Sequence, residues 1–239
     1  MDKKEYFNQA IKSLKKEFPR LKARINQLET IQKSSLKLFK WILLGDPKKR
    51  IYEYHFFLNG ILAKAMNLSE SFAIELDRQN PYSLNMILRS NYESLASLNY
   101  FRKHKDKRKQ LIWGDKYKKK KTENKTESIN VLTMLGELDK DTPNWLSVVE
   151  DYEEMTQVIH PNRKSHLANI KPQENSDSKF SSMFTFSSYC NLDEKGVEMY
   201  LNSQINLFNQ ILKNVKLIDD IFCKANKIKK EMPKIKGEK

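Results

Sequence analysis

The sequence predicts an all-α protein, a helical bundle of about six to seven helices with one basic connection and one long Ser/Asn-rich loop. Apolar residues recur with the 3.6-residue period of an amphipathic helix along most of the chain. No series of short alternating segments, typical of half-buried strands, is present. The 239 residues include only six glycines and seven prolines, which argues against a sandwich or barrel. The length suits one large domain, or one domain with appendages.

The first half of the chain contains four amphipathic segments bounded by start and stop signals. The second segment ends at Gly45-Asp46-Pro47, and a third helix is expected over about 49–78. Asn80 and Pro81 then provide an N-cap with proline at the first helical position, which predicts a fourth helix to about residue 101. Representative members of the four apolar stripes are Phe7, Leu14, Leu28, Ile42, Leu58, Phe72, Leu84, Leu88 and Leu95.

The second half alternates helices with two long connections. A short helix is expected near Ile129 to Leu138, and Thr142-Pro143 opens the next one. That helix should end at His160, because the residue before a proline is pushed away from helical geometry. Residues 161–192 lack a sustained period and predict a long loop. The last helix is expected over about 193–227.

The net charge of +14 is concentrated in two segments. Residues 103–125 hold eleven Lys or Arg against three acidic residues, a net +8, and residues 224–239 carry a further +5. Two interpretations stay open. Such segments bind a polyanion through phosphate contacts, or they are solvated segments without a partner. In the first case, RNA would be bound by the run Lys118, Lys119, Lys120 and Lys121.

Cysteine content and hydropathy favour a soluble, cytoplasmic protein. Cys190 and Cys223 form neither a disulfide framework nor a zinc site. No Glu-x-x-His pair and no His or Cys cluster has metal-ligand spacing, so we predict no metal and no cofactor. The apolar run 41–44 is far too short to span a bilayer, and no export signal is visible, so no membrane partner is expected.

Arg89 and Glu93 are the first candidate site residues. They lie four apart on a helix whose Leu88, Tyr92 and Leu95 should be buried, so both charges project together from near the core. An isolated buried charge is costly, and pairing is the usual remedy. The pair is therefore either a structural tie to neighbouring helices or part of a site for phosphate chemistry.

His160 is the third candidate for a catalytic role. It lies at the expected C-terminus of its helix, where the helix dipole favours an imidazolium suited to general acid catalysis. Alternatively, it only caps the last carbonyls. Arg163 and His166 follow on loop backbone that could reach a ligand, and we assign them to substrate binding, with a surface position without a ligand as the alternative for each. Arg89, Glu93 and His160 are expected to meet at one cleft.

An Arg-x-x-x-Glu on a mid-chain helix (Arg89 to Glu93), with His160-Pro161 after a later helix, resembles bacterial helical proteins of unknown function related to the HEPN superfamily. The resemblance covers about residues 52–225. Many HEPN proteins are metal-independent ribonucleases. They are often toxins or abortive-infection proteins in antiphage defence, and they act as homodimers with the site at the dimer interface.

From the chain's own pattern and charge we predict an N-terminal helical segment (1–47), a HEPN-like bundle (48–227) and a basic, disordered tail (228–239). The resemblance implies a homodimer and an antitoxin or defence-system partner protein. The usual HEPN signature is Arg, a polar residue, then His after four to six residues in all. Arg50 to His55 fits that length, with an apolar residue at the polar position.

Two functions of different classes are consistent with this pattern. The first is an endoribonuclease, in which His160 is the acid or base, Arg89 stabilises the transition state and Glu93 orients one of them. The second is a non-catalytic interaction or regulatory module that binds nucleic acid or a partner protein. A bundle hosts many functions, so the fold alone does not choose between them.

Overall fold

The computed structural model describes residues 2–113, 129–142, 148–159, 170–172, 184–186 and 192–231. Over these residues the chain is an α-helical bundle, which confirms the predicted fold class. Its α-helices are α1 (Lys3–Glu17), α2 (Lys22–Leu44), α3 (Glu53–Asp77), α4 (Pro81–Lys103), α5 (Arg108–Trp113), α6 (Val131–Asp141), α7 (Val148–Ile159) and α9 (Glu194–Ala225). Two short 3-10 turns, Pro19–Leu21 and Lys105–Lys107, precede α2 and α5.

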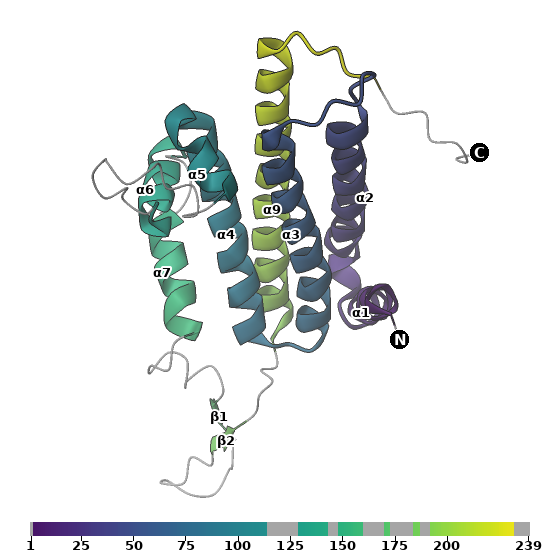
Figure 1. Cartoon of the computed structure of the whole chain (residues 1–239). Helices are drawn as coiled ribbons and strands as arrows, with labels where there is room; N and C mark the ends of the chain where they lie inside the picture. Colours follow the sequence, from purple (N-terminus) through teal and green to yellow (C-terminus); the bar gives the residue numbers. More distant parts are fainter. Residues whose placement is uncertain are drawn as a thin grey trace, which may run out of the picture.

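Four long helices, α2, α3, α4 and α9, form the body of the bundle and lie side by side (Figure 1). α9 contacts the other three, and α4 also contacts α6 and α7 on its other side. α1 packs against α2 and α3 and crosses one end of the bundle. α4 therefore lies between two layers, and its residues line both interfaces.

Side-chain caps fix several helix starts where the sequence places them. The Asn80 side chain accepts a hydrogen bond from the Ser83 amide at 3.3 Å, with Pro81 as the first residue of α4. Asp193 accepts from the Gly196 amide at 2.7 Å at the start of α9. Asn130 does the same for the Leu132 amide at the start of α6. These caps satisfy amides that the first helical turn leaves unpaired.

The predicted apolar stripes meet in one hydrophobic core. Phe72, Phe101 and Phe208 come from α3, α4 and α9, and each is fully buried. Burying a side chain of this kind contributes about 1.5–3 kcal/mol. Polar pairs also lie within this core: the Asn91 amide of α4 donates to Gln204 Oε1 of α9 at 2.9 Å, and both side chains are buried.

Both long connections contain secondary structure that the sequence pattern does not predict. In the basic connection, helix α5 (Arg108–Trp113) packs against α3 and α4. Within 161–192, strands β1 (Ile170–Pro172) and β2 (Phe184–Phe186) pair antiparallel, with Ile170 opposite Phe186. The aromatic and β-branched residues of Phe184-Thr185-Phe186 favour a strand, but three residues are too few for a reliable periodic signal.

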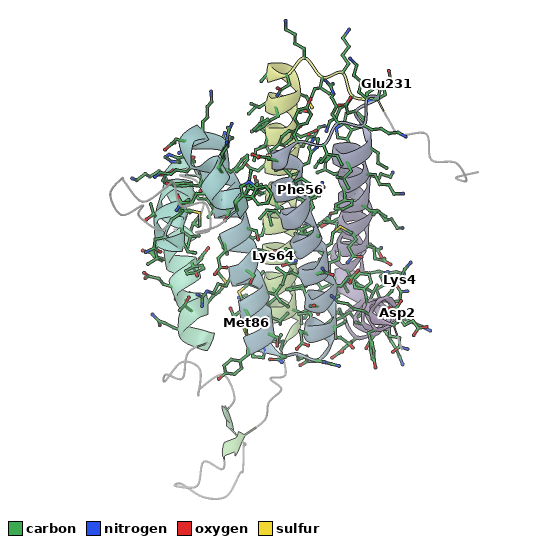
Figure 2. All side chains as sticks on the ribbon, in the orientation of Figure 1. Asp2, Lys4, Phe56, Lys64, Met86 and Glu231 are labelled. Atoms are coloured by element: carbon green, nitrogen blue, oxygen red, sulfur yellow. The ribbon has the colours of Figure 1, made fainter. Side chains whose placement is uncertain are left out.

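The first residues of the basic tail pack on the bundle. α9 ends at Ala225, and Lys227 turns the chain back with a positive φ of 52°. Ile228 is buried, and the Glu231 amide donates to the Gly45 carbonyl after α2 at 2.8 Å. Figure 2 shows Glu231 at the end of the bundle remote from Asp2 and Lys4. A disordered tail is predicted from residue 228 onward, whereas Ile228 and Glu231 make these contacts with the bundle.

Candidate functional site

Arg89 and Glu93 form an ion pair on one face of α4. Arg89 Nε lies 3.5 Å from Glu93 Oε1, and each side chain is 29% exposed. The i,i+4 spacing brings the two together, as the sequence predicts. Both groups lie at the edge of the core, where α7 covers α4. The pair thus keeps one side toward the protein and one side toward solvent.

Tyr152 of α7 bridges this pair. Its hydroxyl accepts a hydrogen bond from Arg89 Nε at 2.8 Å and donates one to Glu93 Oε1 at 2.8 Å. The Arg89 guanidinium carbon also lies 4.8 Å from the centre of the Tyr152 ring, a cation–π distance. We call Arg89, Tyr152 and Glu93 the α4–α7 relay. In this relay, the Tyr152 hydroxyl binds Nε of Arg89, and the Tyr152 ring packs against the guanidinium carbon.

A second tyrosine joins the same two helices. The Tyr92 hydroxyl donates to Asp151 Oδ2 at 2.8 Å. Burial raises the pKa of Tyr92, and the hydrogen bond to Asp151 raises it further. Burial likewise raises the pKa of Tyr152, with the hydrogen bond to Glu93 as the next cause. Both phenols therefore remain protonated donors at neutral pH.

The other predicted site residues lie outside the described residues. These are the proposed catalytic His160, the loop residues Arg163 and His166, and the lysines Lys118, Lys119, Lys120 and Lys121. Helix α7 ends at Ile159, immediately before His160. The expected meeting of His160 with Arg89 and Glu93 therefore stays a prediction. Among the described residues, the group that contacts both Arg89 and Glu93 is the Tyr152 hydroxyl.

A buried cluster at the end of α9 was not predicted. The Lys230 ammonium lies 2.7 and 2.8 Å from the two oxygens of Asp219, and the side chains are 3% and 1% exposed. The Tyr54 hydroxyl of α3 donates to Asp219 Oδ1 at 3.3 Å. Burial raises the pKa of Asp219, and the Lys230 ammonium opposes that rise. We call Tyr54, Asp219 and Lys230 the C-terminal cluster.

Arg50 and His55, which have the length of the HEPN signature, make separate contacts. Arg50 Nε donates to Asp46 Oδ2 at 2.8 Å, within the turn between α2 and α3. His55 Nδ1 accepts from the Tyr52 amide at 3.2 Å and so caps α3. His55 is 1% exposed, and burial, with the nearby Lys230 charge, lowers its pKa to about 4. The buried, neutral His55 imidazole therefore stabilises the start of α3 and is not accessible to a substrate at the surface.

The described residues contain no group of three or more His, Cys, Asp or Glu side chains arranged to hold a metal ion. Across the same part of the chain, no helix combines the length and the apolar character needed to cross a bilayer. The relay and the C-terminal cluster each join a cation, a carboxylate and a tyrosine hydroxyl from different elements of the described fold.

Residues 55–184 match the model of a family of unknown function, DUF5677, and the match covers more than half of the chain. The protein belongs to the DUF5677 family. No curated protein and no solved structure matches the chain. The DUF5677 match contains the entire α4–α7 relay, whereas Asp219 and Lys230 lie beyond it. It carries no HEPN assignment, which remains a proposal.

Sequence reasoning missed Tyr152 as a member of the α4–α7 relay, and it missed the separate Tyr92–Asp151 hydrogen bond between the same helices. Tyr152 occupies a position on the apolar side of α7 and is only 5% exposed. The missed signal is its hydroxyl, because a buried tyrosine normally requires a hydrogen-bond partner. An Arg and a Glu on the facing helix are natural partners for it.

Proposed function

We propose that this DUF5677 protein is a HEPN-like, metal-independent endoribonuclease that acts as a toxin or effector in antiphage defence. The observation that supports the proposal is the α4–α7 relay. A half-buried arginine is held by Tyr152 through Nε at 2.8 Å, and its side chain is 29% exposed. An arginine fixed in this way presents its terminal nitrogens in the planar fork that matches a phosphate.

Cleavage without a metal requires three groups around the scissile phosphate. A base removes the proton of the ribose 2′-hydroxyl, whose oxygen forms a new bond to phosphorus. An acid gives a proton to the 5′-oxygen as its bond to phosphorus breaks. In the proposed roles, His160 is the acid or base and Arg89 stabilises the charged phosphorane. Glu93 and Tyr152 are positioning residues for the guanidinium.

The test is cleavage of labelled single-stranded RNA by the purified full chain in EDTA. Arg89→Ala and His160→Ala should each lower the rate about 100-fold or more, as expected when a transition-state contact is removed. Arg24→Ala, at an exposed arginine of α2, is the matched control and should cleave at the wild-type rate. Wild-type cleavage and cellular toxicity in both site variants would rule the proposal out.

The second candidate is a non-catalytic regulatory module that binds nucleic acid or a partner protein. The observation that favours it is that Arg89 and Glu93 satisfy each other through Tyr152, which is what a structural tie between α4 and α7 requires. This function predicts RNA binding that weakens steeply with salt and proceeds without turnover. The same preparations therefore separate the two candidates, and gel filtration tests the proposed homodimer.

A further inference from the structure

A groove of about 420 Å³ lies where the start of α3, helix α5 and the end of α9 meet. These segments occupy the same end of the bundle in Figure 1. The volume is in the range of small-molecule sites. Its wall includes the rings of Tyr52 and Phe222, which are half-buried, and the apolar side chain of Ile112. The rim carries Lys105 and Lys109 of the basic connection.

The aromatic wall is a connected stack. The Tyr54 ring lies 4.0 Å from Phe222 and 6.0 Å from Tyr52, centre to centre, in stacked geometry. Tyr54 is buried, while Tyr52 and Phe222 each keep part of the ring at the groove surface. Stacked rings already ordered by their neighbours lose little freedom when a ligand covers them. This wall suits a flat aromatic group.

Arg108 fixes a positive charge beside this wall. Its guanidinium carbon lies 5.2 Å from the Phe101 ring centre and 4.9 Å from that of Phe222. Arg108 Nε donates to the Phe101 carbonyl at 2.9 Å, and Nη2 donates to the Arg102 carbonyl at 3.2 Å. These bonds hold the group in one orientation. A cation is thus set against aromatic rings at the start of the +8 segment.

We propose that this groove binds single-stranded RNA, with a base stacked on the half-buried Tyr52 beside Phe222 and the phosphates beside Lys105, Arg108 and Lys109. Aromatic platforms flanked by basic residues are how proteins hold single strands, since every base has a face to stack. In sequence, residues 103–125 carry a net charge of +8, which suits a polyanion better than a single nucleotide.

The groove deepens the proposed function by giving the RNA a second point of contact. Phe101 follows Glu93 by eight residues on α4, a rise of about 12 Å along the helix axis. The role of the strand as a substrate rests on the proposed function, whereas its binding in the groove does not.

Binding is measured by fluorescence anisotropy with a labelled 2′-O-methyl RNA of about ten nucleotides. This RNA lacks the attacking hydroxyl, so binding is separated from cleavage. Tyr52→Leu/Phe222→Leu should weaken binding about tenfold, because stacking is lost while apolar volume is kept. Lys105→Glu/Lys109→Glu should weaken it further and reduce the dependence on salt. Thermal melting checks that each variant is folded.

The matched control is Lys12→Glu/Lys22→Glu, which makes the same charge change at exposed sites of α1 and α2. It should bind RNA like the wild type. Folded groove variants with unchanged binding would overturn the proposal, as would AMP binding as tightly as the RNA. Loss of binding in the groove variants, with Arg89→Ala still cutting unmodified RNA like the wild type, would support the groove and reject the proposed catalytic site.

Discussion

The α4–α7 relay and the C-terminal cluster contain the same three kinds of group in different surroundings. Each combines a cation, a carboxylate and a tyrosine hydroxyl that lies between elements of the fold. The Arg89 and Glu93 side chains are 29% exposed, whereas those of Lys230 and Asp219 are 3% and 1% exposed. Burial is therefore the main difference between the two clusters.

That difference assigns them different roles. A fully buried pair has no surface to offer a ligand, and removing one member leaves an uncompensated charge inside the protein. A half-exposed pair contributes less to stability, because water screens it, but a substrate can reach it. We therefore expect the C-terminal cluster to dominate stability and the relay to dominate activity.

The largest expected effect on stability is that of Lys230→Ala. It removes the ammonium and leaves Asp219 buried and unpaired, which should lower the free energy of unfolding by about 3–5 kcal/mol. Urea denaturation measures the loss, and Lys229→Ala, at the exposed neighbouring residue, is the control. The double variant Asp219→Leu/Lys230→Met should recover most of the stability, because no charge is left buried. If Lys230→Ala lowers the free energy of unfolding by less than about 1 kcal/mol, the C-terminal cluster does not dominate stability.

The second effect is a dependence of stability on pH that comes from His55. Its pKa is lowered from 6.5 to about 4 in the folded protein, so between these values the unfolded chain binds a proton that the folded chain does not. The stability is present above pH 6.5 and is lost as the pH falls toward 4, by up to about 3 kcal/mol. Denaturation curves at several pH values should be flatter over this window in His55→Gln. Parallel curves for the two proteins would contradict the assignment.

The smallest stability effect is expected for Tyr152→Phe in the relay. It removes one hydroxyl and two hydrogen bonds to charged groups, but leaves the Arg89–Glu93 pair at 3.5 Å and the ring in place. A loss of about 1–2 kcal/mol is expected, measured by urea denaturation against Tyr6→Phe at an exposed tyrosine. A loss as large as that in Lys230→Ala would make the relay a structural tie.

The sequence was sufficient to predict the bundle because periodic apolar stripes and caps are local signals. Asn80 and Pro81 mark the start of α4, and the i,i+4 spacing of Arg89 and Glu93 is enough to predict their pairing. Contacts between residues that are distant in the sequence produce no such local pattern. Lys230 looks like one of many tail lysines, and only the turn at Lys227 carries it back to Asp219.

The most direct test of the central claim is a double-mutant cycle of Arg89→Ala and His160→Ala on RNA cleavage. Residues that act on one reacting phosphate are strongly non-additive. We expect the double variant to cleave about as slowly as the slower single variant. Losses that multiply, or an absent loss in either single variant, would show that the guanidinium and the imidazole do not serve one site.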